Sequence, residues 1–208
     1  GVEYQTKGSM KKGPKGKIPF IECDGVVVAD STFCTEYLQE KTGKDLNEKL
    51  DEKQKSIATL LQRMLEENFY WATCYMQVID DPTDVKEQFF STLPYGFQNL
   101  FYSMGASSMK KKLDVHGIGR HSREEIMSIA MKDLRAVSGI LGTNKFMLSD
   151  EPSLADAVVF GMLAAVPDYV AKDNPVVAGL QSGEEFANLR AYLGRMKEKY
   201  WPDWDDIV

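Results

Sequence analysis

Two short runs of β-forming residues joined by Asp24-Gly25 constrain the fold of this chain more than any other feature. The runs cover residues 17–23 and 26–29. An Asp-Gly pair between such runs is typical of a tight hairpin, since both turn residues must adopt positive φ. Asp30 and Ser31 follow at once and can cap a helix over residues 32–41. The sequence therefore predicts two antiparallel strands that lead directly into a helix N-terminus.

The N-terminus of that helix is a candidate binding site. The unpaired N–H groups of its first turn, together with the helix dipole, can accept a carboxylate or phosphate group. Taken alone, the same residues favour an ordinary helix cap that binds no ligand. This feature alone leaves both interpretations open.

The segment from Ile18-Pro19-Phe20 through Asp30-Ser31 resembles the second half of the thioredoxin-like domain of glutathione transferases. The resemblance implies that Pro19 is cis and that the Ile18 backbone pairs with the cysteine of glutathione. It also implies that Asp30 and Ser31 hold the γ-glutamyl end. The family usually has the longer Glu or Gln where this chain has Asp30. Ile18, Pro19, Asp30 and Ser31 are therefore the expected glutathione-binding residues.

A second motif lies at residues 151–163, where Ser153 and Asp156 have the spacing of a capping box. The Ser153 hydroxyl can accept from the N–H of Asp156, while the Asp156 carboxylate accepts from the N–H of Ser153. The apolar run that follows predicts a buried helix over residues 154–166. The pattern resembles the capping-box helix in the C-terminal domain of glutathione transferases, where it serves folding. We expect a structural role for both residues.

Residues 117–125, 29–31 and 200–204 resemble the failed axon connections proteins, which are relatives of the metaxins. This resemblance covers nearly the whole chain and implies an α+β, glutathione transferase-like fold. A partial thioredoxin-like domain over residues 1–44 would precede an α-helical domain over residues 45–208. The family is linked by name to axon development and has no settled enzymatic reaction.

The alternation of Val2 and Tyr4 with polar neighbours predicts a short strand over residues 1–6. On the resemblance, this is the second strand of the thioredoxin-like domain, and the first strand and helix are absent from the sequence. Glutathione transferases place their thiol-activating residue at the end of that first strand, so the catalytic residue is unknown. The chain begins with Gly1, and we expect membrane association only through a segment absent here.

The charge balance excludes nonspecific nucleic-acid binding. The chain of 208 residues has a net charge of −6, whereas such binding needs a dense basic face that displaces counterions. One basic cluster lies among glycines and is expected to be a solvated loop, with an acidic partner or a lipid headgroup as the alternative. It consists of Lys7, Lys11, Lys12, Lys15 and Lys17.

The three cysteines, Cys23, Cys34 and Cys74, show no spacing suited to zinc, so no metal site is expected. Their small number fits a reduced, cytoplasmic compartment. The sequence contains no apolar run long enough to span a bilayer and no signal peptide.

Most of the remaining chain is predicted to be helical. Residues 52–79 form one long helix that ends in an aromatic cluster, which is either core or the lining of an apolar ligand pocket. After a turn at residues 80–82, Thr83 or Asp84 is expected to cap a short helix that reaches residue 92. Further helices are predicted over residues 95–113, 122–141, 174–180 and 184–200.

Two pairs of side chains carry alternative interpretations. His116 and His121 could act as a catalytic acid and base, but no nucleophile with an orienting carboxylate accompanies them, so we favour structural hydrogen bonds. Trp201 and Trp204 are expected to fold back onto the body of the protein, with a partner-binding patch as the alternative.

The preferred functional hypothesis is a non-catalytic interaction or adaptor module in the cytoplasm or on the cytosolic face of a membrane, with protein partners and with a homodimer left open. The alternative is an active glutathione transferase that conjugates glutathione to electrophiles or reduces peroxides. A third hypothesis has glutathione, or another small acidic ligand, bound without chemistry.

Overall fold

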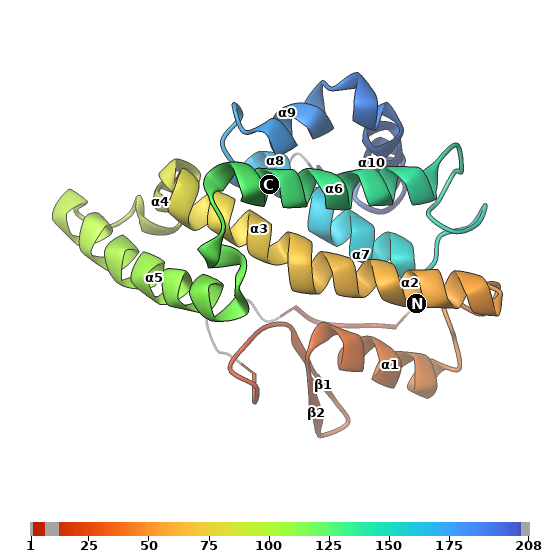
Figure 1. Cartoon of the computed structure of the whole chain (residues 1–208). Helices are drawn as coiled ribbons and strands as arrows, with labels where there is room; N and C mark the ends of the chain where they lie inside the picture. Colours follow the sequence, from red (N-terminus) through yellow and green to blue (C-terminus); the bar gives the residue numbers. More distant parts are fainter. Residues whose placement is uncertain (1, 7–12, 205–208) are drawn as a thin grey trace. The chain divides into compact units, whose positions relative to one another are not determined.

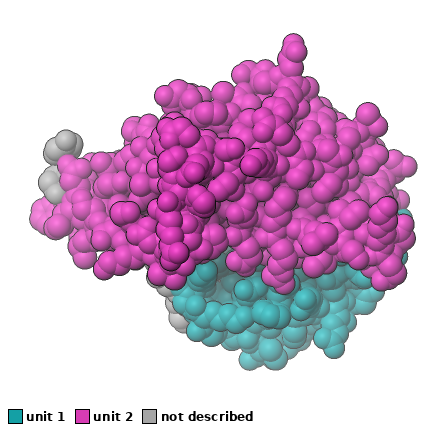
Figure 2. Space-filling view, in the orientation of Figure 1, with its two compact units in different colours: residues 1–49 teal, residues 50–208 magenta. Residues whose placement is uncertain are grey.

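A computed structural model describes residues 2–6 and 13–204, and the chain divides into two compact units (Figures 1 and 2). Unit 1 covers Gly1–Lys49 and unit 2 covers Leu50–Val208. The predicted domain boundary, after residue 44, stays a prediction.

Unit 1 contains the predicted hairpin. Strands β1 (Phe20–Cys23) and β2 (Val26–Ala29) pair antiparallel, with Phe20 opposite Ala29 and Cys23 opposite Val26. The turn residues Asp24 and Gly25 have φ values of 50° and 80°. Helix α1 (Ser31–Thr42) follows and ends at Gly43, whose φ is 67°. The prediction of a hairpin that leads into a capped helix is confirmed.

The predicted strand over residues 1–6 is wrong, because residues 2–6 form no strand. A strand needs a neighbour that completes its hydrogen-bond ladder, and the sheet within the described residues contains β1 and β2 alone. Val2 and Tyr4 are both exposed, so their alternation reflects no buried face.

The predicted basic cluster is described only in part. Lys7, Lys11 and Lys12 lie outside the described residues, whereas Lys15 and Lys17 are exposed. The Lys15 ammonium lies over the Phe33 ring, 4.2 Å from its centroid.

Unit 2 begins with a continuous helical rod over Glu52–Asp80. It consists of α2 (Glu52–Met64), the π-helical segment η1 (Leu65–Phe69), α3 (Tyr70–Tyr75) and the π-helical segment η2 (Met76–Asp80). A reciprocal capping box between Asp51 and Gln54 fixes its start. The predicted long helix is confirmed, and two π turns interrupt its α-helical pattern.

The other helices of unit 2 follow the predicted order. They are α4 (Thr83–Phe90), α5 (Tyr95–His116), α6 (Arg123–Leu141), α7 (Leu154–Leu163), α8 (Val166–Tyr169), α9 (Pro175–Gln181) and α10 (Ala187–Tyr200), with 3-10 turns η3 (Ile118–Arg120) and η4 (Glu184–Phe186). The capping box of Ser122 and Glu125 at the start of α6 is confirmed.

The predicted cap of α4 and the predicted single helix over residues 154–166 are wrong, and α4 ends at Phe90 while α5 extends to His116. Pro82, rather than Thr83 or Asp84, is the N-cap of α4, and it makes no side-chain cap bond. The carboxylate of Asp81, one residue earlier, accepts from the Thr83 N–H at 3.0 Å and from the Thr83 hydroxyl at 2.7 Å. The helix predicted over residues 154–166 divides into α7 and α8, since Pro167 follows and has no N–H to continue the helical ladder.

The core of unit 2 forms where α7 packs against α2 and α6 packs against α3 (Figure 1). Phe69 is fully buried, and Trp71 and Tyr75 pack against the core while partly exposed, which favours the core interpretation of the aromatic cluster. Trp201 stacks on Phe160 with 4.6 Å between ring centroids, and Trp204 meets the same ring edge-on. The predicted folding back of both tryptophans is confirmed.

Asp156 is a fully buried carboxylate that links two segments of the core. It forms the predicted type of capping box with Ser153. Its Oδ2 accepts from the N–H of Ser153 at 2.8 Å and from the Ser153 hydroxyl at 3.0 Å. Its Oδ1 accepts from the N–H of Met147 at 2.8 Å. The carboxylate therefore joins the start of α7 to the loop that precedes it.

Asp133 is a second buried carboxylate, on the face of α6 that meets the first π segment. Its Oδ2 accepts from Nδ2 of Asn68 at 2.7 Å. Burial raises the pKa of Asp133 to about 6, and the hydrogen bond from Asn68 offsets part of that rise. The pair ties η1 to α6 by one polar contact within an apolar core.

None of the helices in the described part of the chain is long and apolar enough to cross a membrane.

Replacement of Asp156 by alanine is expected to lower the free energy of unfolding by about 3 kcal/mol, because it leaves buried N–H groups of Ser153 and Met147 without their acceptor. Urea unfolding measures this. The control is Glu125→Ala, which removes an exposed capping box of the same type and should cost about 1 kcal/mol. If both variants lost the same free energy of unfolding, burial of Asp156 would make no contribution beyond that of an exposed capping box.

Asp133→Asn is expected to stabilise the protein more at neutral than at acidic pH. The pKa of Asp133 in the folded protein, about 6, lies above its ordinary value of 3.8. Its contribution to stability is therefore present below about pH 4 and is lost as the pH rises through about 6. The difference in unfolding free energy between wild type and variant should change by on the order of 2–3 kcal/mol across that range. A difference independent of pH would contradict this.

Candidate functional site

The junction between the hairpin and α1 brings the four predicted binding residues together. The peptide bond between Ile18 and Pro19 is cis. Pro19 directly precedes β1 and Asp30 directly follows β2, and the Asp30 N–H donates to the carbonyl oxygen of Pro19 at 3.3 Å. The antiparallel register of Phe20 with Ala29 therefore places Pro19 next to Asp30.

Asp30 caps α1 from an unusual backbone conformation. Its φ is 92°, a region that non-glycine residues rarely adopt. Its Oδ1 accepts from the N–H of Thr32 at 3.1 Å, and its carbonyl accepts from the N–H of Cys34 at 2.9 Å. Strained residues held by their surroundings are concentrated at functional sites, which makes Asp30 a candidate on geometry as well as on sequence.

The site lies at the surface of its unit. Ile18, Pro19, Asp30 and Ser31 are all exposed, and Ile18 retains 72% of its accessible surface. Ser31 is the first residue of α1, where a backbone N–H has no helical acceptor, whereas the N–H groups of Thr32 and Cys34 already donate to Asp30. An acidic group in solution could therefore approach the N–H and hydroxyl of Ser31.

The rest of unit 1 holds the helix against the hairpin at both ends. Near the site, the buried Cys34 thiol donates to the Val28 carbonyl at 3.2 Å. At the far end, Lys41 donates to Asp24 in the hairpin turn and lies 3.1 Å from the Cys23 sulfur. The hydrogen bond with Asp24 is the main cause of a raised pKa at Lys41 and of a lowered pKa at Asp24.

Sequence reasoning did not single out this Lys41 contact, although a signal existed. A helix that returns antiparallel to the preceding strand carries its last turn back to the hairpin turn, and Lys41 lies in that last turn. A lysine there can meet the Asp of the Asp-Gly pair.

The two histidines have separate structural contacts. Nε2 of His116 lies 2.9 Å from the carbonyl oxygen of Glu67, and its ring stacks on Trp71 with 4.9 Å between centroids. Nδ1 of His121 lies 3.5 Å from a carboxylate oxygen of Glu125. These contacts support the structural role rather than a catalytic pair.

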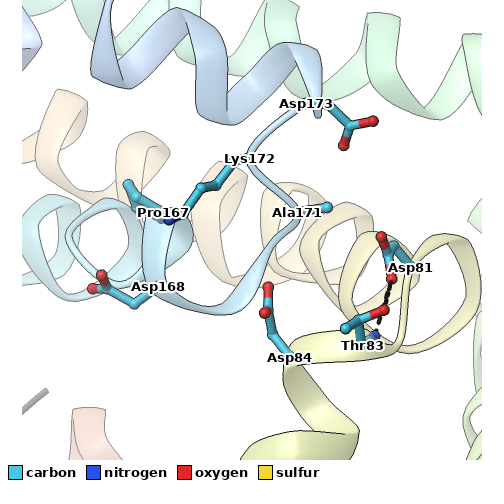
Figure 3. Close-up of a pocket in the computed structure, with 8 residues that line it drawn as sticks. All are labelled: Asp81, Thr83, Asp84, Pro167, Asp168, Ala171, Lys172 and Asp173. Atoms are coloured by element: carbon cyan, nitrogen blue, oxygen red, sulfur yellow. Dashed lines mark hydrogen bonds between the residues drawn. The ribbon is translucent and has the colours of Figure 1, made fainter.

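A separate pocket of about 660 Å³ lies within unit 2, where the start of α4 faces the segment from α8 to α9 (Figure 3). It is lined by Asp81, Thr83, Asp84, Pro167, Asp168, Ala171, Lys172 and Asp173. The hydrogen bonds from Thr83 lower the pKa of Asp81. Sequence reasoning did not find this pocket, since its two sides come from segments far apart in the chain. None of the four predicted binding residues lines it.

Across the residues that the structure describes, no group of three or more histidine, cysteine or acidic side chains could hold a metal ion. Cys23, Cys34 and Cys74 are not joined in disulfides.

Two family models match the chain. The glutathione S-transferase N-terminal domain matches residues 1–83, and the glutathione S-transferase C-terminal domain matches residues 130–196. The order of the two domains agrees with the hairpin unit followed by the helical unit.

Curated relatives match along nearly the whole chain. Failed axon connections of Drosophila melanogaster is 32% identical over 100% of this chain and 52% of its own length. Metaxin-2 of Mus musculus is 25% identical over 92% of this chain and 72% of its own. Isoprene-epoxide–glutathione S-transferase of a Rhodococcus strain is 26% identical over 96% of this chain and 87% of its own. The chain thus spans about half the length of failed axon connections.

The fold and these matches define a class: the chain belongs to the glutathione S-transferase-like proteins, with a thioredoxin-like N-terminal domain and an all-α C-terminal domain. Within that class it is related to failed axon connections and the metaxins. Both the predicted fold class and the predicted family are confirmed.

Asp30→Ala is expected to lower the free energy of unfolding by about 2 kcal/mol, because alanine loses the cap and is strained at a φ of 92°. Asp30→Gly should cost only a few tenths of a kcal/mol, since glycine adopts positive φ freely. The matched control is Asp51, a cap with a φ of −71°. Thermal unfolding should show that the free energies of unfolding of the alanine and glycine variants differ more at position 30 than at position 51. Equal differences at the two positions would exclude backbone strain at Asp30.

Proposed function

We propose that this protein is a non-catalytic interaction or adaptor module of the failed axon connections type, acting in the cytoplasm or on the cytosolic face of a membrane. The observation that carries the proposal is the 32% identity with failed axon connections along the whole chain. Similarity to metaxin-2, again along most of the chain, supports the same branch of the family. In this function the fold supplies a surface for protein partners.

Under this proposal the junction of the hairpin and α1 binds glutathione or another small acidic ligand. Support comes from the cap at Asp30 and the exposed start of α1 at Ser31. The backbone of Ile18 would pair with the cysteine of glutathione, and Ser31 with Asp30 would hold its γ-glutamyl end. Binding at this junction leaves the ligand chemically unchanged.

The second candidate function is glutathione transfer. It is favoured by the 26% identity with isoprene-epoxide–glutathione S-transferase, a relative of which the match covers 87%. In such a reaction the thiolate of glutathione forms a C–S bond with an electrophilic carbon while the leaving group departs with the electron pair of the broken bond. Reduction of a peroxide by glutathione is the variant of this function. The residue that would lower the pKa of the thiol is unknown.

Calorimetry on the full-length protein tests the site. Glutathione binding should be at least about tenfold weaker when Asp30 and Ser31 are both replaced by alanine, because the variant loses the carboxylate and hydroxyl that face the γ-glutamyl end. The control, Ser122→Ala, loses the cap of α6 in unit 2 and should bind like wild type. Equal affinity of the double variant and wild type would exclude this location.

A transfer assay separates the two functions. Wild-type protein, glutathione and a chlorinated aromatic should react no faster than the uncatalysed background if the protein is an adaptor. A complex isolated from cells should also survive the change of Asp30 and Ser31 to alanine. Turnover above background that the double variant loses would replace the adaptor proposal by transferase activity.

A further inference from the structure

Helix α5 has an apolar face that no described residue of its own unit covers. Phe97, Leu100, Phe101 and Met104 are each between 47% and 64% exposed. Their spacing of i, i+3, i+4 and i+7 places all four on one side of the helix. Figure 1 shows α4 and α5 together at one end of the helical unit. Single exposed apolar residues are common, but a contiguous apolar row indicates a binding surface.

The opposite side of α5 already packs on the core, so the exposed row is a second apolar face. Leu113 is buried, and Met109 packs against the core. The Tyr102 hydroxyl donates to the carbonyl oxygen of Val78 at 2.6 Å. These contacts fix the rotation of α5 and leave the other row directed to solvent.

Two lysines continue the exposed row toward the C-terminus of α5. Lys111 follows Met104 by seven residues and Lys112 follows Phe101 by eleven, which are two and three helical turns. Both are exposed. Lys110, in contrast, points elsewhere and pairs with Asp114 at 3.6 Å. We call the four apolar residues with Lys111 and Lys112 the outer face of α5.

The charge of α5 indicates which kind of partner can bind its outer face. Although the chain has a net charge of −6, α5 has no acidic residue before Asp114. A second copy would bring the same apolar row and its own lysines, with no carboxylate on that face to pair with them. The occupant must therefore offer an apolar layer next to negative charge. The surface of an anionic bilayer has this combination.

We propose that the outer face of α5 docks onto the surface of a bilayer that contains anionic phospholipid. The helix lies in the plane of the interface, with its four apolar side chains among the upper acyl chains and its two lysines at the phosphate groups. This mode needs no membrane-spanning segment. It also differs from the association through an absent segment that the sequence suggested, and it does not depend on glutathione binding.

Sedimentation of the protein with vesicles tests the proposal. Wild type should bind vesicles of phosphatidylcholine with phosphatidylserine, and binding should weaken in added salt. The variant Phe101→Glu/Met104→Glu should bind at least about tenfold more weakly. The variant Lys111→Glu/Lys112→Glu should show a similar loss on these vesicles and no change on phosphatidylcholine alone.

Leu60→Glu with Lys53→Glu is the matched control, because both residues are exposed on α2 and lie outside the proposed surface. It should bind like wild type, and circular dichroism should show all variants folded. The proposal is overturned if wild type does not bind, or if the α5 variants bind as well as the control. It is also overturned if vesicle binding is absent and Phe101→Glu/Met104→Glu converts a dimer into a monomer in analytical ultracentrifugation, since a second copy then covers the face.

Discussion

The buried carboxylate of Asp156 is the interaction on which the helical unit most depends. A buried charge is costly unless hydrogen bonds replace the lost water, and Asp156 accepts from two N–H groups and one hydroxyl. These donors belong to the start of α7 and to the loop around Met147. The Tyr192 hydroxyl donates to the Asp156 carbonyl at 3.1 Å, which adds α10 to the same point. Asp156 thereby fixes the start of α7 to the loop that precedes it and to α10, whose Tyr192 lies 36 residues further along the chain.

Unit 1 is organised around a comparable polar point, although it is much smaller. The N–H of Asp30 donates to the Pro19 carbonyl, and the Asp30 carboxylate caps α1. One residue therefore links the hairpin to the helix and directs the first turn of α1 to the surface. The Asp30 carboxylate both caps α1 and belongs to the candidate ligand site. A ligand at this site would therefore either replace the hydrogen bond of the cap or bind beside it.

Local chemistry explains which features could be predicted from the sequence. The Asp24-Gly25 turn and the Ser122 and Ser153 caps depend on residues a few positions apart, so their residue types suffice to find them. The strand over residues 1–6 was wrong because a strand depends on a distant partner. The four residues of the candidate site were found by resemblance. The outer face of α5, in contrast, required the knowledge that the side of the helix with Tyr102 and Leu113 packs on the core. The pocket beside Asp81 needed the tertiary fold.

The two π segments of the rod bear on how this family can change in length. In each, an N–H reaches back five residues instead of four, as from Tyr70 to Leu65 and from Asp81 to Met76. Such a turn holds one residue more than an α-turn of the same span. An inserted residue in η1 is thus absorbed locally, and the side chains of α3 that follow keep their orientation toward α6. A relative that lacks one residue in η1 would therefore retain the same core with a straight α-helix, so a change of chain length within the rod is compatible with an unchanged core.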